Sequence, residues 1–145
     1  MRLCDVSMLT RLQRSTMQSF DVVPVLRDIC NTIMEEHRTG NTECFYEKII
    51  GQYLYERAIP FLTQVDCFIQ QAHTQVHVGR IDMEIAYNTI VELKIGPKVR
   101  QADIDQLMKY VRAKQACGMN LKNALVICFR TDNSVEFVHM KVNGF

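Results

Sequence analysis

The chain has 145 residues, 48% of them apolar, and a formal net charge of +1 at pH 7. This length suits one compact domain with a real core and leaves no room for a second domain of ordinary size. No apolar run approaches the length that spans a membrane, and a near-neutral charge by itself names no partner. We therefore expect a single domain over residues 1–145 that has no membrane association.

The N-terminal segment and the cysteines bear on where the protein works. Residues 1–20 carry three arginines among scattered apolar residues, which is not the pattern of a signal peptide. They fit a short helix and a loosely held N-terminal extension equally well. The six cysteines are scattered and show no CxxC spacing, so we interpret them as reduced thiols. Together these features predict an intracellular protein, cytoplasmic or nuclear.

Two helices are predicted in the segment that follows residue 20. Asp21 can cap the first helix, whose apolar residues recur at helical spacing until Gly40 ends it. The second helix starts at Asn41 or Thr42, and Pro60 closes this region because proline interrupts a helix.

A hairpin of two strands follows the helices. Apolar residues that alternate with polar ones predict strands at 65–71 and 76–86, with a turn near His73-Thr74. Gly79 stands where the alternation changes phase, and this change predicts a bulge in the second strand.

The rest of the chain predicts three more strands and one helix. Their order is strand 90–95, helix 101–117, strand 124–129 and strand 135–142. The strand at 124–129 is apolar throughout, as a strand covered on both faces would be. The helix between the third and fourth strands is a crossover, so we expect those two strands to be parallel.

The predicted crossover helix has two faces. Its buried face is expected to consist of Ile104, Leu107, Met108 and Val111. A separate stripe, which this pattern leaves free to face a ligand, consists of Asp103, Gln106 and Tyr110.

Three charged residues point to chemistry near the hairpin. Asp82 lies near the end of the second strand, and Glu92 and Lys94 stand two residues apart inside the apolar third strand. Because strand side chains alternate between faces, Glu92 and Lys94 point the same way, and the turn brings Asp82 beside Glu92. Two close carboxylates repel each other, and a carboxylate inside an apolar strand is costly to bury unless a cation compensates it.

This set of side chains suits a hard divalent ion. Oxygen ligands are those that Mg²⁺ prefers, with Mn²⁺ as an alternative. A metal ion would activate a water to attack phosphorus, and Lys94 would orient that water or neutralise the phosphate, as hydrolysis of a phosphodiester requires. The alternative is a solvent-facing Glu–Lys pair on an edge hairpin, which contributes little energetically.

An ordered set of motifs resembles a known family. The chain reads Gly40-x-x-Glu43-x-x-Tyr46, then Asp82, then Glu92-x-Lys94, then Gln106-x-x-x-Tyr110. This order resembles the GxxExxY family, a branch of the PD-(D/E)XK nuclease superfamily, from about Gly40 to Phe129. One departure is Ile81, at the position where the superfamily name expects proline.

The resemblance implies an α/β (α+β) fold with a restriction-endonuclease-like αβββαβ core, in which helices flank a mixed central sheet. The element order predicted above agrees with this core. The resemblance also implies that Asp82 and Glu92 bind the metal, while Glu43 orients a metal-bound water or serves as a further ligand. Lys94 would complete the catalytic set, and Gln106 and Tyr110 would flank it from the crossover helix.

Basic residues gather just after the candidate site. From Lys94 to Lys122 there are seven basic residues against two acidic ones, a net charge of +5. We expect nucleic-acid phosphates to be held by Lys98, Arg100, Lys109, Arg112 and Lys114. The sequence therefore predicts a metal-dependent nuclease that acts on DNA, with RNA not excluded and a homodimer left open. The alternative is a nuclease-fold nucleic-acid-binding or assembly module with little or no hydrolytic activity.

Overall fold

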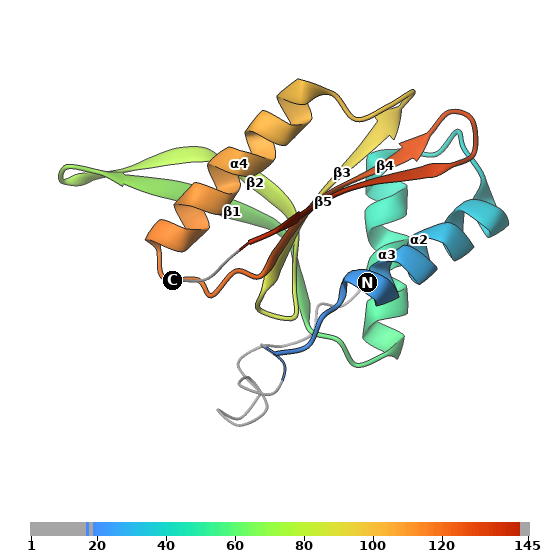
Figure 1. Cartoon of the computed structure of the whole chain (residues 1–145), viewed down its shortest axis with the longest axis horizontal. Helices are drawn as coiled ribbons and strands as arrows, with labels where there is room; N and C mark the ends of the chain where they lie inside the picture. The colour runs from blue at the N-terminus through green and yellow to red at the C-terminus, as the bar shows by residue number, and fades with distance from the viewer. Residues whose placement is uncertain (1–16, 18, 143–145) are drawn as a thin grey trace.

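The structure, a computed structural model, describes residue 17 and residues 19–142 (Figure 1). The choice between a helix and an extension for residues 1–20 falls largely outside this part of the chain. Within the described part, no helix is both long and apolar enough to cross a membrane.

The predicted order of helices and strands is confirmed. The elements are α2 (Val23–His37), α3 (Glu43–Glu56), β1 (Phe61–Gln71), β2 (Thr74–Ile85), β3 (Thr89–Gly96), α4 (Gln101–Ala116), β4 (Asn123–Arg130) and β5 (Val135–Lys141). Their ends differ from the predicted ones by up to a few residues. The largest difference is at β1, which begins directly after Pro60 because Phe61 already pairs with Ile85 of β2.

The described strands form one mixed five-stranded sheet in the order β1-β2-β3-β4-β5. Strands β3 and β4 are parallel, as the crossover through α4 predicts, and every other neighbouring pair is antiparallel. Strand β4 is buried along almost its whole length, which confirms the prediction of a strand covered on both faces. The chain therefore has the α+β fold and the restriction-endonuclease-like core that the sequence predicts.

Strands β1 and β2 form a long hairpin that extends beyond the rest of the sheet (Figure 1). Cys67 pairs with Gly79, whereas the next residue, Phe68, pairs with His77. Val78 is therefore the extra residue of a bulge, next to the glycine at which the sequence predicts one. A bulge increases the local twist and so bends the outer part of a hairpin away from its sheet.

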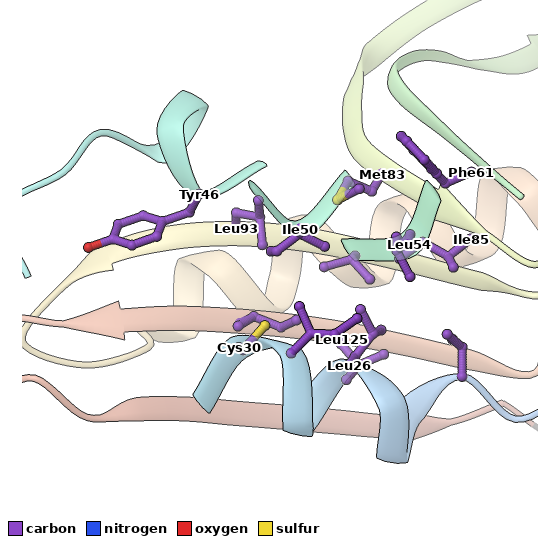
Figure 2. Close-up of a cluster of buried hydrophobic side chains, with 14 of the residues drawn as sticks. Leu26, Cys30, Tyr46, Ile50, Leu54, Phe61, Met83, Ile85, Leu93 and Leu125 are labelled. Atoms are coloured by element: carbon purple, nitrogen blue, oxygen red, sulfur yellow. The ribbon is translucent and has the colours of Figure 1, made fainter. Parts of the chain in front are cut away.

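Helices α2 and α3 pack on one face of the sheet, and Figure 2 shows their side chains gathered with those of the strands. This cluster includes Leu26, Cys30, Tyr46, Ile50, Leu54, Phe61, Met83, Ile85, Leu93 and Leu125. Burying one such large apolar side chain stabilises a fold by about 1.5–3 kcal/mol. The cluster fixes α3 against β3, and so it fixes the N-terminus of α3 relative to the charged residues of that strand.

Helix α4 covers the opposite face. Its Leu107 and Val111 pack with Ile90 and Val126, which alternate along β3 and β4 with the residues of the first cluster. Tyr110 belongs to the same buried cluster and is 3% exposed. The prediction that Tyr110 lies on a stripe apart from the buried face is therefore wrong.

The buried face of α4 is rotated relative to the predicted one, and Ile104 and Met108 are only half-buried. The reason lies in β2. A Cβ at Gly79 would collide with the Tyr110 hydroxyl, so the glycine leaves a space that the tyrosine ring fills. Helical spacing of apolar residues carries no information about such a space on the facing strand.

Candidate active site

Asp82 and Glu92 come together where β2 and β3 separate. The two strands pair regularly up to Met83 and Val91, and the next pair would be Asp82 with Glu92. Instead, the backbone N–H of Asp82 donates to Oε1 of Glu92 at 3.0 Å. The backbone N–H of Leu93 donates to Oδ2 of Asp82 at 2.7 Å. The two carboxylates therefore replace carbonyl groups as acceptors and are held at the point where the strands diverge.

Glu92 is the most deeply buried carboxylate of the site, with 5% of the residue exposed. Burial, followed by repulsion from Asp82, raises the pKa of the Glu92 carboxyl to about 8. The hydrogen bond from the Asp82 backbone and the positive charge of Lys94 oppose this shift. Such a carboxyl is stabilised by a proton or by a cation.

Glu43 reaches the same region from the first turn of α3. Thr42 caps this helix by accepting a hydrogen bond from the N–H of Phe45 at 3.1 Å. Partial burial raises the pKa of Glu43, Lys94 lowers it and Asp82 raises it. Glu43 therefore lies within electrostatic range of both residues, and the structure brings it to the site as the sequence predicts.

Tyr46, the last residue of the Gly40-x-x-Glu43-x-x-Tyr46 motif, has a structural place. Its ring stacks on Phe129 of β4 with centroids 3.9 Å apart and an interplanar angle of 2°. Its hydroxyl donates to the carbonyl of Arg38 at 2.7 Å. The tyrosine thus ties the loop before α3 to the sheet, and in this way it fixes where the helix presents Glu43.

A pocket of about 510 Å³ opens beside these residues on the α3 side of β2. Its lining residues are Glu43, Cys44, Glu47, Gln64, Arg80, Asp82 and Leu93. Glu47 and Gln64 were not among the residues that the sequence singled out for the site. The pocket is large enough for a cation. Three of its lining residues are acidic, so its charge also favours a cation.

Lys94 lies between the site and the N-terminus of α4. Its Nζ is 3.9 Å from Oδ1 of Asp103. The other oxygen of Asp103, Oδ2, accepts a hydrogen bond from the N–H of Arg100 at 2.9 Å. Asp103 therefore caps α4 and attracts Lys94 at the same time, a role that the sequence did not reveal.

Gln106 and Tyr110 belong to α4, which covers the face of the sheet opposite α2 and α3. The Tyr110 hydroxyl donates to the carbonyl of Arg80 at 3.1 Å. Burial is the main reason that the pKa of Tyr110 is raised, and a hydrogen bond with Gln106 opposes the shift. Tyr110 therefore contacts the backbone two residues before Asp82 and supports the strand that carries the carboxylate, while Gln106 bonds to Tyr110.

The basic residues divide into two groups. Four of the five that the sequence proposed for phosphate contacts are exposed: Lys98, Arg100, Lys109 and Arg112. Lys114 instead pairs with Glu84 at 2.9 Å, and their side chains are only 18% and 12% exposed. Lys114 is therefore already neutralised by a protein carboxylate.

The donor set fits a divalent metal ion with few protein ligands. No three Asp, Glu, His or Cys side chains in the described residues gather closely enough to enclose a metal ion, so Glu43 does not form a ready-made trio with Asp82 and Glu92. Each of those two carboxylates uses one oxygen in a backbone hydrogen bond. Mg²⁺ is commonly held by one or two carboxylates together with waters and substrate phosphates, and this requirement matches the pair.

Comparison with known families gives one match. A profile of the PD-(D/E)XK nuclease superfamily matches residues 21–140. The chain belongs to this superfamily. The match begins two residues before α2, ends one residue before the end of β5 and includes Asp82, Glu92 and Lys94. Searches of curated proteins and of solved structures give no match.

Membership indicates nuclease activity on a nucleic acid, and nucleases of this superfamily generally use divalent metal ions. The acid of β2 followed by acid-x-lysine in β3 is the pattern that the superfamily name describes, here with Ile81 in place of proline. The narrower assignment to the GxxExxY branch stays a prediction.

Proposed function

We propose that this superfamily member is a metal-dependent nuclease that hydrolyses phosphodiester bonds in DNA. The observation that supports this most directly is the exchange of hydrogen bonds between Asp82, Glu92 and their neighbouring strand backbones. It orients two carboxylates in a partly buried place beside a lysine, and this combination has little value for the stability of the sheet alone.

Asp82 and Glu92 are the proposed metal ligands, and Glu43 is proposed to bind through a water or as a further ligand. A divalent ion bound there, Mg²⁺ or Mn²⁺, would supply an activated water and stabilise charge on the phosphate oxygens. Lys94 donates to the phosphate as negative charge develops in the transition state. Gln106 and Tyr110 are proposed to keep the β2 backbone in register beside the reacting groups.

The proposed substrate contacts follow the exposed basic residues: Lys98, Arg100, Lys109 and Arg112. Lys98 and Arg100 precede α4 and lie a few residues after Lys94, so a nucleic-acid backbone bound to them would lead toward the site. Lys114 is the weakest candidate because Glu84 already pairs with it. We further propose a single-domain intracellular protein of the GxxExxY branch.

The test is cleavage of labelled single-stranded DNA, duplex DNA, branched DNA and single-stranded RNA by the purified protein. Each substrate is incubated with Mg²⁺, with Mn²⁺ and with a chelator. Metal-dependent cleavage of at least one DNA, lost on chelation and in Asp82→Asn, supports the proposal. Binding of DNA without cleavage under any metal would instead favour the binding or assembly module, and cleavage of RNA alone would correct the substrate.

A further inference from the structure

Gln64 contacts the candidate site from β1, on the side of β2 away from Glu92. Its Nε2 donates to Oε1 of Glu47 at 2.8 Å and lies 3.4 Å from Oδ1 of Asp82. The second oxygen of Asp82 is already held by the N–H of Leu93 at 2.7 Å. Each oxygen of the Asp82 carboxylate therefore faces a donor from a different neighbouring strand.

The backbone at Gln64 is unusual for a strand. Its φ is +53°, in the left-handed region that residues other than glycine rarely adopt. The register of β1 and β2 passes from Thr63–Met83 to Val65–Ile81 without a regular Gln64–Asp82 pair between them. Strained conformations of this kind persist only when the surroundings impose them, and they cluster at functional sites.

Core packing does not account for the strain at Gln64, because its side chain is exposed. The left-handed conformation instead changes the direction in which the Gln64 side chain points. An ordinary strand residue would keep its ladder pairing with Asp82, whereas here the Gln64 amide reaches both Glu47 and Asp82. The ladder around Asp82 is thus interrupted on both sides, by Gln64 toward β1 and by Glu92 toward β3.

The chemistry of the amide suits this place. Burial is the main reason that the pKa of Glu47 is raised, the hydrogen bond from Gln64 opposes the shift, and Asp82 is near enough to raise the pKa further, as like charges do. A primary amide carries two N–H donors on one nitrogen and no charge, so it can bond to both carboxylates. Glu47 accepts the shorter of the two bonds and so holds the amide in position toward Asp82.

We propose that Gln64 is a positioning residue that orients the Asp82 carboxylate for metal binding, with Glu47 as its anchor. The inference rests on the proposed function, because it assumes that Asp82 is a metal ligand. Gln64 itself does not touch the metal ion or the substrate. Its loss should weaken metal binding and leave the rate at saturating metal nearly unchanged.

The test measures the affinity for Mn²⁺ directly, by electron paramagnetic resonance in the absence of nucleic acid. Gln64→Met keeps the length of the side chain and removes both donors. It should weaken Mn²⁺ binding by about five- to tenfold, the scale of one ordinary hydrogen bond. The Mn²⁺ concentration for half-maximal DNA cleavage should rise by the same factor. The matched control is Gln70→Met on the same strand, whose amide donates to the carbonyl of Ala72 at the hairpin turn and should not affect either value.

A second variant separates positioning from stability. Gln64→Gly removes the side chain and relieves the left-handed backbone, so its melting temperature with chelator should be equal to or higher than that of the parent. Its Mn²⁺ affinity should nevertheless fall as in Gln64→Met. A residue that serves only the fold would not weaken metal binding while the fold becomes more stable.

The outcomes distinguish this inference from the proposed function. If Gln64→Met and Gln64→Gly bind Mn²⁺ as the parent does while Asp82→Asn does not, the metal site stands and the role of Gln64 is refuted. If the parent itself neither binds Mn²⁺ nor cleaves, the proposed function fails and the inference fails with it.

Discussion

Asp82 and Glu92 each accept a hydrogen bond from the backbone of the strand that carries the other, at 2.7 Å from Leu93 and at 3.0 Å from Asp82 itself. These bonds orient both carboxylates before any cation is present. A metal ion therefore does not have to order its ligands when it binds. Without the ion, burial and mutual repulsion favour a proton on Glu92, whose pKa is raised to about 8.

The first prediction concerns the two carboxylates. Asp82→Asn and Glu92→Gln keep an oxygen that can accept the same backbone hydrogen bond, so both variants should fold, with melting temperatures equal to or slightly above that of the parent. Cleavage should fall by a factor of roughly a hundred or more, the scale of losing one group that stabilises the transition state. Single-turnover cleavage and thermal melting measure the two effects.

A divalent ion should raise the melting temperature of the parent and not of these variants. Binding at a hundred times the dissociation constant stabilises a folded protein by about 2.7 kcal/mol. Asp28→Asn, an exposed change on α2, is the matched control and should respond to metal as the parent does. Normal cleavage by either site variant would refute the site.

The second prediction is a pH dependence of the metal-free protein. The pKa of Glu92 is raised from 4.5 to about 8, so at intermediate pH the folded state holds a proton that the unfolded state has released. The contribution of Glu92 to the free energy of unfolding is therefore complete below pH 4.5 and is lost as the pH rises toward 8. Urea titrations with chelator should show this decline in the parent and a smaller one in Glu92→Gln. An identical decline in both proteins would assign it to other groups.

The third prediction concerns nucleic-acid binding. Lys98→Glu and Arg100→Glu should weaken DNA binding, and each lost phosphate contact should flatten the slope of log affinity against log salt by about 0.9 for duplex DNA. The control is Lys141→Glu, at the end of β5 that pairs with Asn123 and away from Lys94. Affinity that is unchanged in both Lys98 and Arg100 variants would exclude this surface.

The fourth prediction separates Lys114 from the exposed basic residues. Lys114→Met leaves the Glu84 carboxylate without its partner at 2.9 Å in a largely buried place. We expect a loss of about 1–3 kcal/mol in the free energy of unfolding, less than the ~3–5 kcal/mol of a fully buried pair. The double variant Glu84→Gln/Lys114→Met should recover most of it. A salt slope that falls in Lys114→Met without a loss of stability would show instead that Lys114 binds phosphate.

Local patterns in the sequence were enough to predict the element order and the meeting of Asp82 with Glu92. Strand alternation gives the direction of Glu92, and a short turn between antiparallel strands fixes which residues lie opposite each other. The same reasoning gave the parallel pairing of β3 and β4, because a helical crossover imposes it. These features depend on residues that are close in the chain or on the type of connection between elements.

The contacts of Tyr110 and Gln64 could not be predicted in this way. Tyr110 is buried because Gly79, far away in the sequence, leaves a space on the facing strand. Gln64 reaches Glu47 and Asp82 only because its backbone adopts a left-handed conformation, for which glutamine has no preference. Both depend on the packing of distant segments, which periodicity does not record.

The last prediction concerns Lys94, because its loss separates a nuclease from a binding module. As a catalytic group, Lys94 acts on the phosphate in the transition state and contributes little to metal binding in the ground state. Lys94→Met keeps most of the side chain and removes the charge. The variant should bind DNA and Mn²⁺ much as the parent does, yet its turnover should fall by roughly a hundredfold or more.

Asp103→Asn refines this test. The Asn side chain still offers an oxygen to the N–H of Arg100, so α4 keeps its cap, while the negative charge 3.9 Å from Lys94 is lost. Turnover should fall less than in Lys94→Met, because Lys94 keeps its charge and loses only an attraction that positions it. If Lys94 were structural, Lys94→Met would leave Glu92 without a compensating charge and would lower the melting temperature, with no activity to lose. Melting temperature and single-turnover cleavage measured on the same samples decide between these outcomes, and a sharp loss of stability in Lys94→Met with an inactive parent would favour the binding module.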